Sequence, residues 1–226
     1  MPARDASKEP LSRERVLAAA LALADAEGLG AVTMRRVAEA LDCEAMTLYY
    51  YVDDKKALLA ALTEAVVAEI AAACRHLDSS ADGSDWRQLV RERCLTARQV
   101  MLRHPWAPSL VATQARTPPS AFGLFEALVG AMVQGGCSYD LAHRAIHALG
   151  SMLLGFTQEL FEPTADDAGT SPEEMMAVAR AMPHLARLAE VAVHEAEGSL
   201  SMCDTQAEFE FTLGLILDGL EAHRGE

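Results

Sequence analysis

Three consecutive tyrosines, Tyr49, Tyr50 and Tyr51, stand just before Lys55 and Lys56. Neighbouring residues of a helix point about 100° apart, so three successive rings cannot all face one core and at least one is turned outward. Tyrosine hydroxyls donate hydrogen bonds to phosphate oxygens in protein–DNA contacts. The alternative is that all three rings pack around a helical core with their hydroxyls in water. The spacing by itself leaves both interpretations open.

The distribution of charge restricts where this chain could meet a polyanion. Its net charge is −14, with 19 Lys and Arg against 33 Asp and Glu. Most of the acidic excess falls in residues 57–226, whereas residues 1–56 are nearly balanced and contain every lysine. Because an acidic surface repels nucleic acid, contact with a polyanion is expected only in the N-terminal quarter.

Within that quarter the basic and acidic side chains are expected to separate. Four basic side chains should share one face: Arg35, Arg36, Lys55 and Lys56. Three acidic side chains should point away from it: Asp25, Glu27 and Glu39. If each DNA half-site then neutralises few phosphates, the affinity for DNA should fall only gently as salt is raised.

Helices are the elements that must position these residues. Ser12 is a candidate N-cap, and the apolar residues after it recur at helical spacing, which predicts a helix over 12–27. Thr33 caps a short second helix that ends at Asp42, and a third segment covers 44–51. Two short helices joined by a turn of about three residues and braced by a preceding helix form a helix-turn-helix candidate.

The rest of the chain is expected to be helical as well. Apolar residues at steps of three or four predict one amphipathic helix of about 22 residues after Asp54, followed by a polar stretch at 78–85. A content of 51% hydrophobic but only 5% aromatic residues favours packed helices over sheets. Further helices are expected at 85–103, 106–115, 119–135, 139–161, 172–196 and 204–223. We therefore predict an all-α protein with three parts: a flexible arm at 1–11, a helix-turn-helix head at 12–56 and a larger helical body at 57–226.

Several other kinds of chemistry are not indicated. The five cysteines are scattered without a CxxC pair, so neither a disulfide framework nor a structural zinc site is predicted. His143 and His147 share a helix face, but two ligands make a weak metal site and a polar pair is the simpler interpretation. Motifs of zinc proteases, di-iron bundles, GxSxG hydrolases and P-loop enzymes are missing, so we predict no enzyme, no cofactor and no metal. Without a long apolar segment or a signal peptide, a cytoplasmic protein with no membrane partner is expected.

The predicted head carries a pattern of residue types that is characteristic of one family. Thr33 and Arg35 open the second helix, Leu41 precedes the turn, and Leu48–Val52 runs Leu-Tyr-Tyr-Tyr-Val with Lys55 shortly after it. This arrangement resembles the DNA-binding head of the tetracycline-repressor (TetR/AcrR-type) family. The resemblance covers roughly the segment from the first predicted helix to residue 65, and the final predicted helix is more weakly similar to that of one branch of the family.

The resemblance implies a DNA-binding surface made of nine residues: Thr33, Arg35, Ala45, Met46, Thr47, Tyr49, Tyr50, Tyr51 and Lys55. Thr33 would bond a phosphate, and Arg35 would reach a base edge or a phosphate. Residues 45–47 would lie in the major groove, and the tyrosines would hold the DNA backbone on either side. Lys55 would bring its ammonium and the positive end of a helix to a phosphate.

This chain departs from the family pattern at the turn and at the start of the third helix. Asp42 stands where the family usually has glycine, and aspartate tolerates left-handed backbone better than most residues. Ala45 and Met46 offer no hydrogen bonds, so base readout there is expected to use apolar contact, for instance with thymine methyl groups. Glu44 either accepts a hydrogen bond from a cytosine amino group or caps its helix.

The resemblance also implies a homodimer, because a two-fold pair of heads doubles the contacts and reads a palindrome. Two helices per subunit would then form a four-helix bundle across the two-fold axis, whereas the alternative is that both are interior helices. The expected interface residues are Ala142, Ile146, Leu149, Gly150, Leu153, Phe211, Leu215 and Gly219.

Methionine and aromatic residues of the body would by default form its core, but the family uses this region as a pocket for a small-molecule inducer. Our candidate ligand-binding residues are Trp106, Gln114, Phe122, Phe125 and Phe156.

These observations predict a ligand-responsive transcriptional regulator. Its partners would be a double-stranded DNA operator of palindromic sequence, a second copy of the chain and an unidentified inducer that releases the DNA, which makes it a repressor. An activator is not excluded by the sequence. The alternative from another class is a helical small-molecule-binding protein or enzyme with a vestigial head, which the acidic composition and the apolar third helix would favour.

Overall fold

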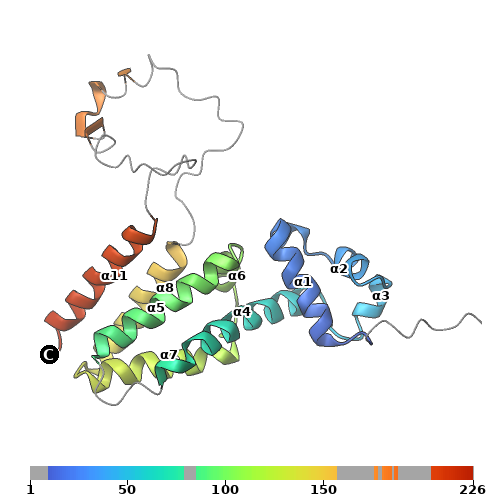
Figure 1. The fold of residues 1–226 in the computed structure, drawn as a ribbon, viewed down its shortest axis with the longest axis horizontal. Helices are drawn as coiled ribbons and strands as arrows, with labels where there is room; N and C mark the ends of the chain where they lie inside the picture. The colour runs from blue at the N-terminus through green and yellow to red at the C-terminus, as the bar shows by residue number, and fades with distance from the viewer. Residues whose placement is uncertain are drawn as a thin grey trace, which may run out of the picture.

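All regular structure in the residues described by the computed structural model is helical. Those residues are 10–78, 85–156 and 205–225, with short stretches between 176 and 187. The elements, in chain order (Figure 1), are α1 (Arg13–Glu27), the 3₁₀ turn η1 (Leu29–Ala31), α2 (Met34–Ala40), α3 (Ala45–Leu48), α4 (Lys55–Asp78), α5 (Trp86–Arg103), α6 (Ala107–Ala112), α7 (Pro119–Gln134), α8 (Tyr139–Gly155) and α11 (Thr205–Ala222).

Helices α1, α2 and α3 form the head, and their ends are fixed by local hydrogen bonds. The Ser12 hydroxyl accepts from the Arg15 N–H at 3.3 Å, and the Thr33 hydroxyl accepts from the Arg36 N–H at 3.2 Å, which confirms both predicted N-caps. Asp42 has a φ of +53° in the turn after α2, so the left-handed conformation expected of it is confirmed.

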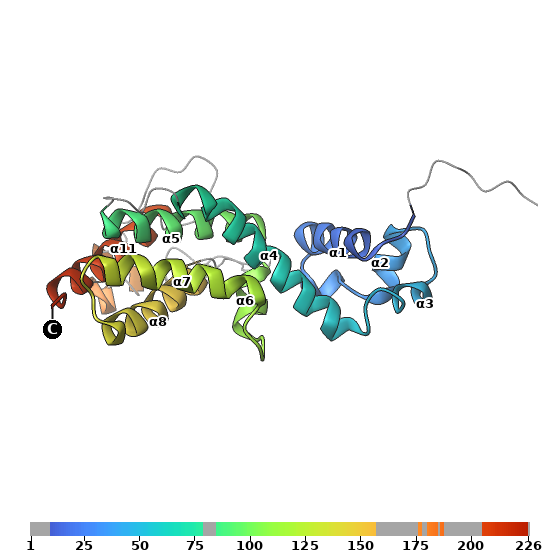
Figure 2. The same ribbon diagram turned by 90° about the horizontal axis from the view of Figure 1, so that it is seen from below.

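Helix α4 joins the head to the body (Figure 2) and belongs to the core of both. The Asp54 carboxylate accepts from the Ala57 N–H at 2.6 Å and so caps its first turn. Further along, α4 packs against α5 and α7. By length and composition alone α4 could cross a membrane, but its apolar side is buried against these neighbours, and we interpret it as a core helix.

The body has a second apolar core, formed by α5, α7, α8 and α11. Arg98 of α5 contacts both α8 and α11 at one end of this core. Its Nη1 donates to the Phe156 carbonyl, at the end of α8, at 2.6 Å, and its guanidinium lies 4.8 Å from the centre of the Phe209 ring of α11. Gly135, just after α7, lies directly against the Trp86 side chain, and a Cβ there would fall far inside van der Waals contact of that ring. The contacts of Arg98 and the contact between Gly135 and Trp86 thus lie at different places in this second core and help to pack its helices together.

Several predicted element boundaries differ from the structure. The third segment is helical only over Ala45–Leu48, because the N–H groups of Tyr50 and Tyr51 bond three residues back and tighten the chain into a turn. The helix expected at 106–115 is shorter, with Pro108 in its first turn. The helix expected at 172–196, the end of that at 139–161, and most of the arm at 1–11 lie outside the described residues.

Candidate nucleic-acid interface and ligand pocket

The outer side of α3 presents an apolar and aromatic surface. Met46 is 74% exposed and Tyr50, four residues later, is 86% exposed, while Leu48 between them is fully buried in the head core. Thr47 and Tyr49 are also exposed, and Ala45 is half-buried. Met46 in α3 and Tyr50 in the turn that follows it are therefore both available for contact on the outer side of the head.

Tyr51 differs from its two neighbours. Its hydroxyl donates to the Leu11 carbonyl at 2.9 Å, and its ring packs against the head core, edge-on to the Tyr50 ring at 5.3 Å. This contact fastens the segment before α1 to the turn after α3. The structure thus departs from the expectation that all three tyrosines face DNA, since only Tyr49 and Tyr50 keep their hydroxyls free of this internal contact.

The expected separation of charges on the head is wrong for two of the three acidic residues. Glu39 accepts from Arg35 Nε at 2.8 Å, because the two stand four residues apart on α2. Glu27 accepts from both terminal nitrogens of Arg36, at 2.7 and 2.6 Å. The hydrogen bonds from Arg36 lower the pKa of the Glu27 carboxyl, and the same pairing raises the pKa of Arg36.

Two lysines remain available beside this surface. Lys55 is the first residue of α4 and Lys56 follows it, and both are exposed. Within the described part of the chain, no carboxylate lies within ion-pair distance of either ammonium group. Arg35 also stays 85% exposed in its pair with Glu39, and Thr33 caps α2 with its hydroxyl. The positive charge that could meet a phosphate is therefore concentrated at the start of α4.

The third acidic residue, Asp25, connects the head to the body. Asp25 of α1 accepts from the Trp106 indole N–H at 2.7 Å and lies 2.7 Å from His104 Nδ1. The other ring nitrogen of His104 lies 3.1 Å from a Glu69 oxygen on α4. Arg103 also bonds Glu69, and these partners, Arg103 foremost, lower the pKa of the Glu69 carboxyl. Trp106, expected in the ligand pocket, is thus a buried residue of this junction.

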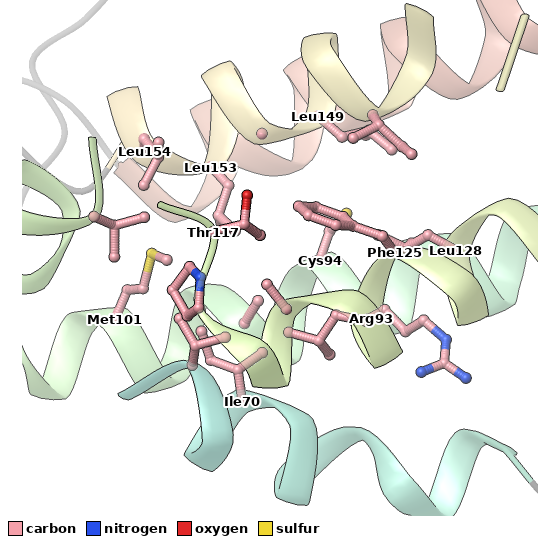
Figure 3. A pocket seen from close by; sticks show the side chains of 18 of the residues that line it. Ile70, Arg93, Cys94, Met101, Thr117, Phe125, Leu128, Leu149, Leu153 and Leu154 are labelled. Carbon is pink, nitrogen blue, oxygen red and sulfur yellow. The ribbon is translucent and has the colours of Figure 1, made fainter. Parts of the chain in front are cut away.

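A cavity of about 380 Å³ lies in the body between α4, α5, α6, α7, α8 and the segment before α7 (Figure 3). Most of its lining is aliphatic or aromatic, from side chains such as Ile70, Met101 and Leu128. Burial raises the pKa of the Cys94 thiol, which also lines the cavity, to about 12. A concave apolar space with few polar groups is the usual form of a small-molecule site.

Only part of the expected ligand set lines this cavity. Gln114 and Phe125 do so. Phe122 is instead 63% exposed on the outer side of α7. Phe156 packs edge-on against Phe209, with ring centres 5.9 Å apart, in the body core.

The expected dimer residues also divide into two groups. On α8, four of them line the cavity: Ile146, Leu149, Gly150 and Leu153. Ala142 is fully buried, because that side of α8 faces α5, α7 and α11 of its own subunit. On α11, by contrast, Phe211 is 66% and Leu215 57% exposed, and Gly219 is exposed as well. The α8 residues therefore lie inside one subunit, whereas those of α11 lie on its surface.

The outer side of α8 carries His143 and His147, whose rings stack edge-on at 4.8 Å. Among the described residues, no group of three or more His, Cys, Asp or Glu side chains is placed to hold a metal ion.

Comparison with known proteins identifies the family of the chain. The profile described as "Bacterial regulatory proteins, tetR family" matches residues 16–62, and "Tetracyclin repressor-like, C-terminal domain" matches residues 79–224. The chain belongs to the tetR family. It is accordingly a ligand-responsive transcriptional repressor, and its family is regulatory rather than catalytic.

Individual members of the tetR family resemble the chain over most of its length. The class D tetracycline repressor protein of Escherichia coli is 32% identical over 168 residues, which are 73% of this chain and 74% of that protein. A possible TetR family transcriptional regulator from Streptomyces coelicolor A3(2) superposes with a TM-score of 0.74 at 30% identity, covering 94% of this chain and all of that one. A TetR variant from Acinetobacter baumannii AYE, solved in complex with minocycline, gives a TM-score of 0.66 at 25% identity, covering 96% and 100%.

Sequence reasoning missed one charged residue that lines the cavity. Arg93 lines the cavity from α5 and is only 8% exposed. A signal for it existed, since Arg93 falls on the same helix side as Leu89, Val90 and Ala97, which are all buried. A charged residue on the apolar side of a core helix must find a partner or a ligand.

Proposed function

We propose that two copies of this chain bind a palindromic DNA operator through their heads, and that a small molecule in the body cavity releases them. The observation that carries the DNA-binding part is the exposure of Met46 and Tyr50 on a helix-turn-helix, next to the unpaired Lys55. Soluble proteins seldom leave large apolar side chains so fully exposed in a row without a partner. The alternative of a vestigial head gives no reason to keep this surface.

In this proposal α3 enters the major groove and the flanking residues hold the backbone. Met46 and Ala45 would make apolar contacts with base edges, and Thr47 would add a hydroxyl contact. Tyr49 and Tyr50 would donate to phosphates on one side, and Lys55 with Thr33 and Arg35 on the other. Tyr51 would act indirectly, by holding the turn against the segment before α1.

A second copy of the chain is the proposed occupant of the exposed side of α11. Phe211 and Leu215 stand four residues apart there, and Gly219 continues the same strip. Helix α8 lies beside α11, so two such pairs would form a four-helix bundle about a two-fold axis. A dimer of this kind would set the separation of the two α3 helices at the spacing of DNA half-sites, about 34–36 Å.

The proposed release runs through α4 and the junction to the head. Helix α4 borders the cavity through Val67, Ile70 and Cys74, and it carries Glu69 at the junction with Asp25 and His104. A ligand that shifts α4 would therefore move the head through bonds that already join them. That a relative binds minocycline supports a ligand in this region. We also propose that the protein acts in the cytoplasm.

Fluorescence anisotropy with duplexes from the DNA upstream of the protein's own gene tests this proposal. The full-length protein should bind one such duplex specifically, and Tyr50→Ala should weaken binding about tenfold by removing a phosphate contact and apolar area. Phe122→Ala, which removes another exposed aromatic ring, this one from the body, is the control and should leave DNA affinity unchanged. Equal effects of the two substitutions, or no specific duplex, would contradict the proposal.

A further inference from the structure

The described residues that line the body cavity carry charge of one sign only. Arg93 and Arg116 are the charged ones among them, and they include neither aspartate nor glutamate. This contrasts with the whole chain, in which acidic residues outnumber basic ones 33 to 19. Arg116 is exposed at the edge, while Arg93 lies inside. The cavity therefore offers a positive potential within an acidic protein, and its apolar walls strengthen that potential.

Arg93 has hydrogen-bonding capacity that the protein does not use. Its Nη2 donates to an Asp78 oxygen at 2.6 Å, but its Nε is buried and has no hydrogen-bond acceptor. The two partners are also unequally placed, since the Arg93 side chain is 8% exposed and that of Asp78 is 57% exposed. Water screens the carboxylate more than the guanidinium, so the buried positive charge is only partly compensated.

From these observations we infer that the inducer is an apolar molecule with one anionic group, and that Arg93 is the residue that selects it. This inference rests on the proposed function, because it concerns the ligand that the repressor would sense. Arg93 lies at the opposite end of the cavity from Met101 and Leu154 (Figure 3). A ligand with a hydrophobic ring system or chain would fill the apolar part. Its carboxylate, sulfonate or phenolate oxygens would accept the unused donors of Arg93.

The pair of Arg93 and Asp78 would also link a bound ligand to α4, the helix that joins the body to the head. Asp78 is the last residue of α4, so an anion that bonds Arg93 competes with the carboxylate that holds the end of this helix against α5. Binding would weaken the Arg93–Asp78 pair and free that end of α4. Removing the Asp78 charge should in turn strengthen anion binding, because Arg93 would then have no competing partner.

Two fluorescent probes with one aromatic skeleton test the inference on the full-length protein. Anilinonaphthalene sulfonate carries a permanent negative charge, and phenylnaphthylamine is its neutral counterpart. The wild-type protein should bind the sulfonate about tenfold more tightly than the neutral probe, as a charge-assisted hydrogen bond in a buried site allows. Equal affinities, or binding of the neutral probe alone, would overturn the inference.

Four substitutions then assign the preference to its residue. Arg93→Met should abolish the preference for the sulfonate while leaving neutral-probe affinity unchanged, which also shows that the pocket is intact. Arg93→Lys should retain part of the preference, and Asp78→Asn should raise sulfonate affinity about threefold. Arg116→Met is the control at the edge and should change the ratio of affinities less than twofold, because its charge is solvated. An unchanged ratio in Arg93→Met would overturn the inference.

The outcome is independent of the DNA-binding test. Should the wild type bind its upstream duplex but show no preference for the anionic probe, the repressor function stands and the ligand class is wrong. If the probes behave as expected but no duplex is bound, the pocket chemistry stands and the proposed function fails.

Discussion

Arg36 in the head and Arg93 in the body both meet a carboxylate, but they do so in opposite ways. Arg36 is exposed, and both of its terminal nitrogens bond the two oxygens of Glu27. Arg93 is buried, makes one such bond to Asp78 and leaves Nε without an acceptor. The head thus uses much of its positive charge internally and offers DNA mainly shape, two tyrosines and two lysines. The body instead leaves part of the hydrogen-bonding capacity of Arg93 unused beside an apolar cavity.

The largest expected difference between the two regions is in cysteine reactivity. The pKa of the Cys94 thiol is raised to about 12 by burial in the cavity wall, whereas Cys43 in the head is half-exposed. At about pH 8, alkylation of Cys94 by iodoacetamide should be roughly a thousandfold slower than that of an ordinary thiol, because the thiolate is the reacting form. Peptide mass spectrometry over time should find Cys43 modified long before Cys94.

The control for this experiment is the unfolded chain. In denaturant both thiols lose their surroundings and should react at similar rates. Similar rates in the native protein would instead mean that Cys94 is open to solvent and not buried in the cavity wall.

The junction between the two regions provides the next largest effect. Trp106 is 7% exposed and donates to Asp25 of α1, so Trp106→Ala leaves a cavity and also removes this bond. The free energy of unfolding should fall by about 3–5 kcal/mol, and the head and body should unfold in separate steps in urea. Trp106→Phe keeps most of the ring and loses the indole N–H, so it should cost only about 1 kcal/mol.

A single steep transition in Trp106→Ala would contradict this interpretation of the junction. It would mean that the apolar core along α4 is sufficient to couple head and body without the bonds made by Asp25.

How far the sequence determines these features depends on how local their causes are. Ser12, Thr33 and Asp42 could be assigned from the sequence because each acts on backbone within about three residues. The bond from Tyr51 to Leu11 spans 40 residues, and the pairing of Arg36 with Glu27 depends on how α1 and α2 cross. No periodic pattern along the chain contains that information.

The interior of the body was predicted least well for the same reason. Helix α8 has an apolar side that fits an interface between subunits or an interior position equally, and in the single subunit Ala142 and Leu149 on that side pack against its other helices. The cavity collects residues from five helices and the segment before α7. Composition could suggest Phe125 and Gln114, but it also suggested Phe122, which faces solvent.

A smaller effect, confined to the body, is expected at the end of α7. Gly135→Ala would place a methyl group against the Trp86 ring, and the displacement of that ring should lower the free energy of unfolding by about 1–3 kcal/mol. Gly130→Ala, within the same helix, meets no atom within 4 Å and should instead add about 0.5–1 kcal/mol through its better helix propensity. Opposite signs in denaturant titrations, with unchanged DNA affinity, would localise the contact to the body.

The smallest expected effect is on the pH dependence of the head. The pKa of the Glu27 carboxyl lies below its ordinary value of 4.5 in the folded protein because of its hydrogen bonds from Arg36. Because the pKa is lower in the folded protein, this pair contributes its full stabilisation of the head at pH values above the ordinary pKa. The contribution is lost as the pH falls through the lowered pKa. Arg36→Gln should therefore lower the thermal midpoint slightly at about pH 7, and the difference from wild type should disappear at an acidic pH below the lowered pKa of Glu27. The same substitution should leave the affinity for the neutral and anionic probes unchanged, because Arg36 lies in the head. An equal difference in midpoint at both pH values would show that Arg36 acts through packing of its aliphatic stem rather than through the charge of Glu27.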